Sequence, residues 1–437
     1  MMMKNIILKI LIWKLSLIAR LTIKRYKPAV IGVTGNVGKT SAKMAIAAAL
    51  SGERSVRASS NNFNNELGLP LNIIGDWEKT GGAFFWLKAV LFGVFQLIVK
   101  NPRYPEILVL EYGVDRPNDM NYLLDIARAQ IGVITAIGNV PVHVEFFSGP
   151  DGVAKEKAKL IAQLPATGFA VLNADDPKVL KMAEDTRGRV ITYGISDKAD
   201  IKIINFRNQL DAETGEAGIY FKIGYNGNVV PFRIPGVLGK TAAYASAVGI
   251  AVGMTFGINL VKIADNLVKA EKPTGRLRVL RGLKGSIVID DTYNASPLAM
   301  REALEIFKTL KAKRKIAVLG DMLEIGKYTM EAHEEIGALA AKRADLLITV
   351  GLRGKLIAEG AFKNRMAKNS IFSFDNIHEA GRFLQDKLKA GDIVLLKASQ
   401  GVRLEKVVKE IMAEPLRSKE LLVRQDKAWL EKEGIYE

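Results

Sequence analysis

The stretch GVTGNVGKTSAK, Gly32–Lys43, lies between an apolar run and an alanine-rich segment. Residues 30–33 predict a buried strand, and the residues from Lys39 onward predict a helix whose positive N-terminal end points at the loop. Glycines in the loop let the backbone fold around phosphate oxygens without obstruction by a Cβ atom. The sequence therefore predicts a nucleotide phosphate site. Its candidate contacts are Gly35, Asn36, Val37, Gly38, Lys39, Thr40 and Ser41.

Two side chains of this loop suit a nucleoside triphosphate. Lys39 would neutralise the β- and γ-phosphates, and the Thr40 hydroxyl would bind Mg²⁺. The strict spacing G-x-x-x-x-G-K-[ST] is not met, because Val33 occupies the first glycine position and the glycine lies one residue earlier, at Gly32. An isolated near-match can be a simple turn. Its place between a strand and a helix favours phosphate binding.

Short β-rich runs alternate with helical stretches on both sides of the segment EKPTGRL, residues 271–277. The runs before it are AVIGVTG, EILVLEYG, IGVITAIG and FAVLNAD, and those after it are GSIVIDD, KIAVLGD, DLLITVG and DIVLLKAS. This alternation predicts an α/β fold. We expect a central P-loop ATPase domain with a mostly parallel sheet over residues 29–272, followed by a Rossmann-like α/β C-terminal domain over residues 273–437. Residues 200–235 predict a hairpin excursion.

The composition limits location and partners. A chain of 437 residues that is 49% hydrophobic can bury more than one core. It has no cysteine, which excludes a disulfide framework and a cysteine nucleophile and fits the reducing cytoplasm. The 63 Lys and Arg residues against 46 Asp and Glu give a net charge of +17, which attracts nucleotides or an anionic membrane. Neither a zinc finger nor an aromatic RNA-binding signature accompanies the charge, so no nucleic-acid partner is expected.

Two apolar segments raise the question of membrane contact. Residues 1–28 carry seven basic residues and no acid, but Lys9, Lys14 and Arg20 interrupt the apolar runs, whereas a spanning helix needs about 20 apolar residues. The basic positions fall on two sides of a helix, which favours docking on the protein's own body over peripheral contact with the inner face of a membrane. The second segment, residues 83–99, is interpreted as a buried helix, with peripheral membrane binding as the alternative.

Titratable side chains stand out in three of the predicted segments. Glu111 ends the run ILVLE, where it either binds Mg²⁺ or meets solvent as an ordinary strand-end charge. His143 lies in PVHVEFF, two residues before Glu145, although a lone histidine is more often structural than a ligand. The segment GVAKEKAKL presents lysines that also fit a solvated helix face.

These motifs occur in the order seen in Mur ligases, and the chain resembles that family over about residues 29–412. The motifs are TGNVGKTS, NNFNNELGLPL, VLEYG, PVHVEFF, AKEKAKL, the pair GR at 275–276, DDTYNASP, VLGDMLEIG and LLKAS. Within the family, the chain looks most like ligases that join D-Ala-D-Ala to a muramoyl-tripeptide. The resemblance implies an ATP- and Mg²⁺-dependent reaction of peptidoglycan synthesis. A substrate carboxylate attacks the γ-phosphate, an acyl phosphate forms, and the incoming amine displaces phosphate.

The resemblance also implies roles for individual residues. Catalytic roles fall on Lys39, His143, Lys157 and Arg276. Metal binding falls on Thr40, Glu111, His143 and Lys157, with carbamylation at Lys157 and with Lys155 as the register alternative. Nucleotide binding adds Arg276, Asp290 and Tyr293 to the loop, with Asp291 on the same wall. Substrate binding falls on Asn64, Asn65 and Glu66 for the acceptor, and on Asn294, Asp321, Glu324, Lys397 and Ser399 elsewhere in the site.

Several positions depart from the family's pattern. Only about 28 residues stand where the family has a domain that binds the UDP-sugar, so the carrier of the acceptor stays open between UDP and a lipid. Ala136 replaces the asparagine of the T-N-x-G motif that usually precedes the histidine in the family. Thr241, Ala242 and Ala245 depart from the pattern at the expected base site, and Ala398 and Gln400 depart from it in the C-terminal motif. Base preference and contacts to the second substrate are therefore expected to differ.

Three functional interpretations follow. The first is the peptidoglycan-precursor ligase, expected to act as a monomer. The second is a related amide ligase with a folylpolyglutamate-like or cyanophycin-like acceptor, against which the segment NNELGLPL argues. The third is a non-catalytic, nucleotide-binding scaffold associated with a membrane. Retention of Lys39, Thr40, Glu111, His143 and Lys157 argues against such a scaffold.

Overall fold

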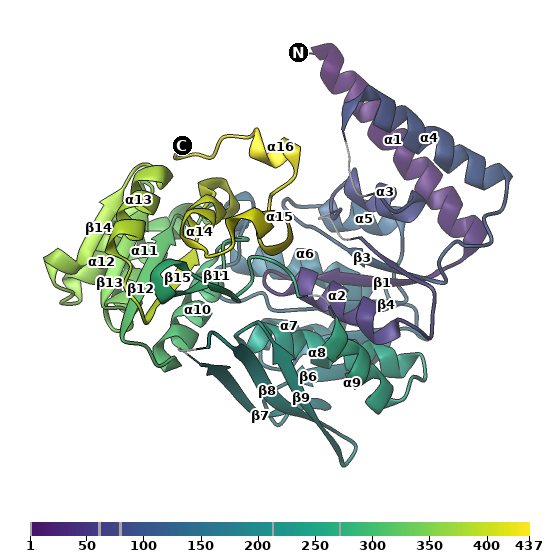
Figure 1. Ribbon diagram of the computed structural model, residues 1–437. Coiled ribbons are helices and arrows are strands. Elements are labelled where there is room, and N and C mark those ends of the chain that lie inside the picture. Colours follow the sequence, from purple (N-terminus) through teal and green to yellow (C-terminus); the bar gives the residue numbers. More distant parts are fainter. Residues whose placement is uncertain (1, 60–62, 78–80, 212–213, 271) are drawn as a thin grey trace.

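The computed structural model describes residues 2–59, 63–77, 81–211, 214–270 and 272–437, which form two sheets with helices on both faces (Figure 1). The nine-stranded sheet has the order β2-β3-β1-β4-β5-β6-β7-β8-β9, and the six-stranded sheet has the order β10-β11-β15-β12-β13-β14. The first sheet consists of β1 Ala29–Thr34, β2 Val56–Ala58, β3 Ile107–Glu111, β4 Ile131–Ile134, β5 Phe169–Asn173, β6 Arg189–Gly194, β7 Ile201–Leu210, β8 Ala217–Tyr225 and β9 Asn228–Pro235. The second consists of β10 Arg278–Arg281, β11 Ile287–Asp290, β12 Arg314–Gly320, β13 Leu346–Val350, β14 Ile371–Phe374 and β15 Asp392–Lys397.

Helices connect these strands. The helices of the first half are α1 Met2–Tyr26, α2 Lys39–Leu50, α3 Gly68–Ile74, α4 Gly82–Ile98, α5 Asp119–Ile126, α6 Pro150–Ala162, α7 Pro177–Leu180, α8 Lys240–Thr255 and α9 Leu260–Lys269. Those of the second half are α10 Pro297–Thr309, α11 Thr329–Ala341, α12 Gly354–Lys363, α13 Ile377–Lys387, α14 Glu405–Ile411, α15 Ser418–Leu421 and α16 Lys427–Leu430. The predicted α/β class is confirmed.

Each face of the first sheet has its own helices because alternate residues of a strand point to opposite sides. Ile31 and Val33 of β1 pack in one core with residues of α2, α8 and α9, whereas Val30 packs in the other with residues of α3, α5 and α6. At Gly32 a Cβ atom would lie 2.9 Å from Leu160 of α6. This close approach of α6 to β1 accounts for the glycine at this position.

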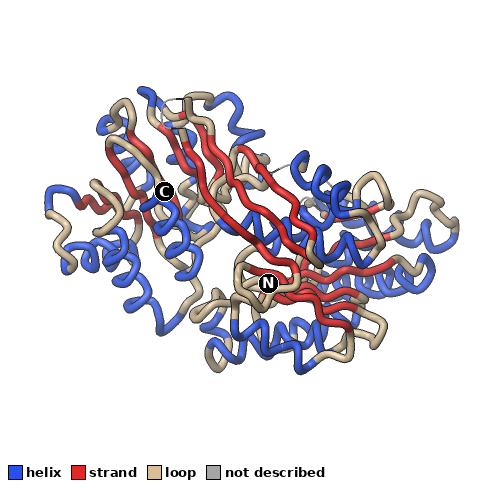
Figure 2. Tube along the Cα trace, turned by 90° about the horizontal axis from the view of Figure 1, so that it is seen from below, coloured by secondary structure: helices blue, strands red, loops and turns tan. Residues whose placement is uncertain are grey.

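The strands from β2 to β7 pair in parallel, and the last pairs are antiparallel. The predicted hairpin excursion over residues 200–235 is confirmed as β7, β8 and β9, which are the long strands of Figure 2. Leu210 and Ala217, at the far end of β7 and the start of β8, pack against the core of the second sheet. The excursion therefore braces the two halves against each other.

The second sheet is parallel except for β10, which pairs antiparallel with β11. Helices α10, α11 and α12 cover one face and α13 and α14 cover the other. Because the strands are parallel, the loops after β11, β12 and β15 meet at one edge, which is where ligands bind in open α/β sheets.

Helices α1 and α4 lie side by side and project from the first sheet (Figure 1). Leu15, Ile18 and Ala19 of α1 are buried, so part of the N-terminal segment docks on the body as expected. The interpretation of residues 83–99 as a buried helix is wrong, because α4 buries only Ala89, Gly93 and Gln96. In the part of the chain that the structure describes, no helix is both long enough and apolar enough to cross a membrane.

Candidate active site

The phosphate loop joins β1 to α2. Gly38 caps α2 with φ 92°, and Gly35 has φ 143°, both in the region that favours glycine. Two hydrogen bonds fix the loop to the segment after β4. Asn36 N donates to Ala136 O at 2.7 Å, and Asn36 Oδ1 accepts from Val142 N at 3.2 Å. The first N–H groups of α2 have no intrahelical acceptor, so they are available to an anion.

Lys39 lies within this loop and donates to Gly35 O at 3.1 Å. Burial lowers the pKa of Lys39, and Glu111 opposes the shift. A bound phosphate would replace the carbonyl acceptor with a stronger, charged one. The ammonium group is therefore positioned to turn from the loop to a nucleotide.

Glu111 ends β3 beside β1 and is buried. Its Oε2 accepts from Thr40 Oγ1 at 3.3 Å and lies 3.6 Å from Lys43 Nζ, and its Oε1 accepts from Asn64 Nδ2 at 3.5 Å. Burial alone would raise the pKa of Glu111, but Lys43, Lys39, Arg276 and the hydrogen bond from Asn64 together outweigh burial and lower it. The residue is therefore held as a carboxylate next to the phosphate loop.

Lys157 is buried and projects from α6 toward Glu111 and the phosphate loop. Within the described residues its ammonium group has no hydrogen-bond or ion-pair partner. Burial, and next the charge of Lys39, lower its pKa to about 7. Near neutral pH a substantial fraction of Lys157 is therefore an uncharged amine, which is nucleophilic.

His143 precedes the short turn at residues 144–146 and adopts φ 64°. Asp115 Oδ1 lies 3.2 Å from its Nε2, and Glu324 Oε2 lies 2.9 Å from its Nδ1. The hydrogen bond from His143 lowers the pKa of Glu324. Asp115 follows β3 and Glu324 follows β12, so the imidazole bridges the two halves of the molecule.

Arg276 lies in the segment between the two sheets and crosses to the phosphate loop. Its Nη2 donates to Thr40 Oγ1 at 3.3 Å, and its guanidinium carbon lies 4.1 Å from the centre of the Tyr293 ring. Its Nε is buried and has no hydrogen-bond partner among the described residues. Such an orphaned donor beside a phosphate loop fits an anionic ligand.

A cavity opens between the phosphate loop, α8 and the loop after β11. Its walls include Asn36, Val37, Ser41, Thr241, Ala242, Ala245, Arg276, Asp291, Tyr293, Asn294, Glu302 and Lys397. The departures Thr241, Ala242 and Ala245 make the α8 wall small and largely apolar. Burial raises the pKa of Glu302, which faces the cavity from α10.

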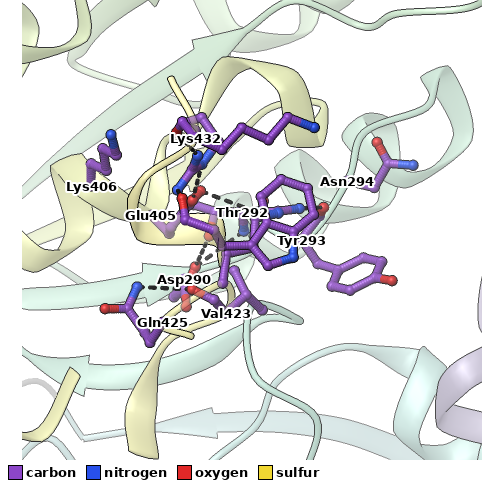
Figure 3. A network of polar contacts seen from close by, with 12 residues as sticks. Asp290, Thr292, Tyr293, Asn294, Glu405, Lys406, Val423, Gln425 and Lys432 are labelled. Carbon is purple, nitrogen blue, oxygen red and sulfur yellow. Dashed lines mark hydrogen bonds and ion pairs between the residues drawn. The ribbon is translucent and has the colours of Figure 1, made fainter. Parts of the chain in front are cut away.

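The two neighbouring aspartates of DDTYN point in different directions. Asp291 lines the cavity, and its Oδ2 lies 2.7 Å from Lys397 Nζ. Asp290 does not line it. Its Oδ1 accepts from Thr292 Oγ1 at 2.6 Å, and its Oδ2 has no partner among the described residues. Asp290 belongs instead to a polar network with Glu405 and the C-terminal tail (Figure 3).

The expected substrate residues have separate surroundings. On the acceptor side, Asn64 contacts Glu111, whereas Asn65 Oδ1 accepts from Gly68 N at 2.9 Å at the start of α3, and Glu66 is exposed. The first two asparagines of NNFNNELGLPL lie outside the described residues.

On the other side, Asp321 is buried and its Oδ2 accepts from the Tyr436 hydroxyl at 2.6 Å. Lys397 donates to Asn294 O at 2.9 Å, and Ser399 Oγ accepts from Leu323 N at 2.9 Å. Lys397 and Ser399 thus fix the loops that follow β11 and β12.

The donor set at the phosphate loop fits Mg²⁺. A hydroxyl and a carboxylate, from Thr40 and Glu111, lie side by side next to the phosphate site, and oxygen ligands suit this ion. A metal at His143 would replace one of its two carboxylate contacts. Among the residues that the structure describes, no three His, Asp or Glu side chains form a metal-binding group.

Lys43 and Asp115 are among the residues of this site that escaped the sequence analysis. Lys43 follows Lys39 by four positions, so a helix places both on one face, and this spacing is the signal that would have found it. Asp115 follows Glu111 by four positions in a loop, and no periodic pattern marks it. Lys43 and Asp115 join the site only in the folded chain, where β3, α2 and the turn after His143 meet.

Comparisons with known proteins agree with this geometry. The model of the Mur ligase middle domain matches residues 92–253, and that of the Mur ligase, glutamate ligase domain matches residues 275–400. The chain is 31% identical over 389 residues to the UDP-N-acetylmuramoyl-tripeptide–D-alanyl-D-alanine ligase of Bacillus subtilis, covering 89% of this chain and 76% of that protein. It is 28% identical over 393 residues to the protein of the same name from Synechocystis, covering 90% and 76%.

Among solved structures, a MurF ligase from Thermotoga maritima in complex with ADP superimposes with a TM-score of 0.74 at 25% identity, covering 93% of this chain and 84% of that one. Sequence and structure thus lead to the same family. The chain is a member of the Mur ligase family.

Proposed function

We propose that this chain is an ADP-forming ligase that joins D-alanyl-D-alanine to a muramoyl-tripeptide precursor of peptidoglycan. The observation that carries the proposal is the meeting of Lys39, Thr40, Glu111 and Arg276, which come from both halves of the chain. The names of the Bacillus and Synechocystis relatives support the choice of substrates.

In the proposed reaction the acceptor's carboxylate attacks the γ-phosphate of ATP. A C–O–P linkage forms, ADP leaves, and the amine then attacks the acyl carbon and releases phosphate. Lys39 and Arg276 hold the phosphate oxygens and stabilise the charge that develops on them. Thr40 and Glu111 would hold Mg²⁺, which would further neutralise that charge.

The chain must also exclude water from the site, because an acyl phosphate hydrolyses readily. The contacts Arg276–Thr40 and His143–Glu324 both join the first half of the chain to the second. They keep the two halves together over the reacting groups. We place the boundary between the two domains near residues 272–273, where the segment that carries Arg276 begins.

We also propose that Lys157 is carbamylated. Its uncharged amine would attack carbon dioxide, form an N–C bond and release a proton, which replaces a cation by an anion. The position of Lys157 near Lys39 favours the anion. Replacement of Lys157 by alanine should reduce ligase activity by about a hundredfold or more. High bicarbonate should not restore it, but a small carboxylate should do so in part; full activity in the variant would remove Lys157 from the site.

We propose that the protein acts as a monomer in the cytoplasm, since one chain supplies every group named above. The proposal includes peripheral contact of residues 1–28 with the inner face of the membrane. It includes no nucleic-acid partner.

The deciding experiment measures phosphate release from ATP with purified protein, UDP-muramoyl-tripeptide and D-Ala-D-Ala, omitting each in turn, together with the product mass. A product heavier by one dipeptide, formed only in the complete mixture, is the expected result. A parallel reaction with a lipid-linked muramoyl peptide identifies the carrier. ATP binding without turnover on either acceptor would contradict the proposal, and turnover with folate- or cyanophycin-type acceptors alone would replace it.

A further inference from the structure

Helix α1 carries an apolar stripe on its outer face. Ile6, Ile10, Trp13, Leu17 and Leu21 follow one another at intervals of three or four residues, so they line one side of the helix. All five are exposed, and Trp13 is 63% exposed. The opposite side of α1 is the one that docks on the body through Leu15, Ile18 and Ala19.

Helix α4 repeats this arrangement. Phe84, Leu87, Leu91, Phe95 and Ile98 are spaced by three or four residues and are all exposed, with Phe84 at 81% and Ile98 at 74%. Together with Val99, the residue that caps α4, the two helices hold more than half of the exposed large apolar side chains of the described residues. Monomeric soluble proteins rarely expose such a concentration of apolar surface without a partner.

Basic residues border the stripe on α1. By helical spacing, Lys9 and Arg20 lie along one edge of the stripe, and Lys14 and Arg25 lie along the other. The two-sided distribution that argued against a membrane-surface helix thus brackets the apolar face. The segments 1–28 and 81–105, which contain both helices, have no aspartate or glutamate. Long basic side chains can place their charge at the headgroup level while their stems contact apolar surface.

The two helices form a preformed unit (Figure 1). A Cβ atom at Gly93 of α4 would lie 2.6 Å from Ile18 of α1, and Arg25 Nη2 donates to Ile98 O at 3.2 Å. Tyr26 OH donates to Gln96 O at 2.8 Å. The helices therefore run in the same direction in close contact, and the exposed stripes do not need a folding step before they bind.

We propose that this two-helix surface, formed by the outer faces of α1 and α4, binds an anionic phospholipid membrane in the plane of its headgroups. Apolar side chains with bordering lysines and arginines are the features that such an interface selects. A second copy of the chain would bring the same positive charge to the contact and be repelled, whereas anionic lipid is complementary in charge. Membrane binding does not depend on the ligase reaction, since it needs neither ATP nor acceptor.

The test uses the full chain and sedimentation with vesicles of phosphatidylcholine, with and without phosphatidylglycerol. We expect binding to the anionic vesicles that weakens as salt is raised. Replacing Lys9, Lys14 and Arg20 by glutamine should weaken binding about fivefold for each residue, or about a hundredfold in all. The paired change Leu91→Gln and Phe95→Gln should abolish binding at any salt. Phe362→Gln, an exposed apolar residue on α12, is the matched control.

A second measurement does not rely on loss of binding. The chain contains no cysteine, so Leu91→Cys and Phe362→Cys each offer one labelling site for an environment-sensitive fluorophore. Anionic vesicles should shift the emission at residue 91 and leave that at residue 362 unchanged. Equal responses at both sites, or none at residue 91, would overturn the proposal. So would light scattering that shows the glutamine variants of α4 dissociating a dimer while vesicle binding persists.

Discussion

Glu405 is the residue whose removal should most disturb the second half of the chain. It begins α14, is completely buried, and accepts from Arg403 Nε at 2.5 Å and from Arg424 Nη1 at 3.1 Å. Arg424 in turn donates to the carbonyl groups of Thr292 and Tyr293. The change Glu405→Ala would leave two buried guanidinium groups without their counter-ion.

The size of the effect follows from burial. Removing one partner of a buried ion pair costs about 3–5 kcal/mol, because the remaining charge stays uncompensated in a region of low dielectric. Both arginines keep carbonyl acceptors, since Arg403 also donates to Lys432 O at 2.6 Å and to Trp429 O at 3.0 Å. We therefore expect a loss of about 4 kcal/mol in the free energy of unfolding, or a fall in Tm of about 8–16 °C.

The same change should reach the nucleotide site. Arg424 holds the backbone of Tyr293, and the Tyr293 ring supports Arg276, which contacts Thr40 in the phosphate loop. A looser Tyr293 lets Arg276 move, so KM for ATP should rise while the dipeptide requirement stays the same.

Urea unfolding followed by circular dichroism measures the stability, and the phosphate-release assay measures KM. Glu405→Gln, which keeps the shape and one acceptor oxygen, should give an intermediate loss. Glu414→Ala breaks an exposed pair with Arg417 and should leave Tm unchanged. A loss below about 1 kcal/mol in Glu405→Ala, or an equal loss in the Glu414 control, would refute the reasoning.

Three further predictions address single positions. Gly35→Ala should abolish ATP binding measured by calorimetry, because its Cβ atom would lie 1.9 Å from Thr135 Oγ1 at φ 143°; wild-type affinity would show that the loop can move aside. Arg276→Ala should raise KM for ATP by about tenfold, or about 1.4 kcal/mol, and an unchanged KM would place the guanidinium outside the nucleotide site. Burial raises the pKa of Asp290 from 3.8 to about 6, so this carboxyl favours the folded state below about pH 4 and loses that contribution as pH rises through 6. The stability of Asp290→Asn relative to the native protein should therefore increase as the pH rises from 4 to 6, by on the order of 2 kcal/mol. Melting curves of both proteins recorded at pH 4 and pH 7 measure this change. A stability difference that is independent of pH would contradict the raised pKa.

Much of the fold could be predicted because its information is local. Runs such as AVIGVT and ILVLE are apolar throughout, as strands buried on both faces must be, and glycines mark the loop between β1 and α2. The side chains at the carboxyl ends of β1 and β3 meet because neighbouring parallel strands end at one edge. The contact between Thr40 and Glu111 was therefore within reach of the sequence.

Other features could not be predicted, because they depend on which surface covers which. An apolar helix such as residues 82–98 has the same sequence whether it is buried or exposed, and only the packing of α1 and α3 shows that most of α4 is left uncovered. Likewise, Asp290 and Asp291 are identical neighbours, and the strand's alternation together with the position of the C-terminal tail sends one into the network with Glu405 and the other into the cavity.

The sequence by itself determined the α/β class, the phosphate loop and the residue types that phosphate transfer needs, since these follow from short-range periodicity and from chemistry. Only the tertiary structure decided which other residues these side chains contact. It brought Lys43 to Glu111, aimed Lys157 at the phosphate loop, set Arg276 across the gap between the two sheets, and left the outer faces of α1 and α4 exposed. The physical reason is that pKa values, ion pairs and exposure depend on contacts between segments far apart in the chain, which no local pattern encodes.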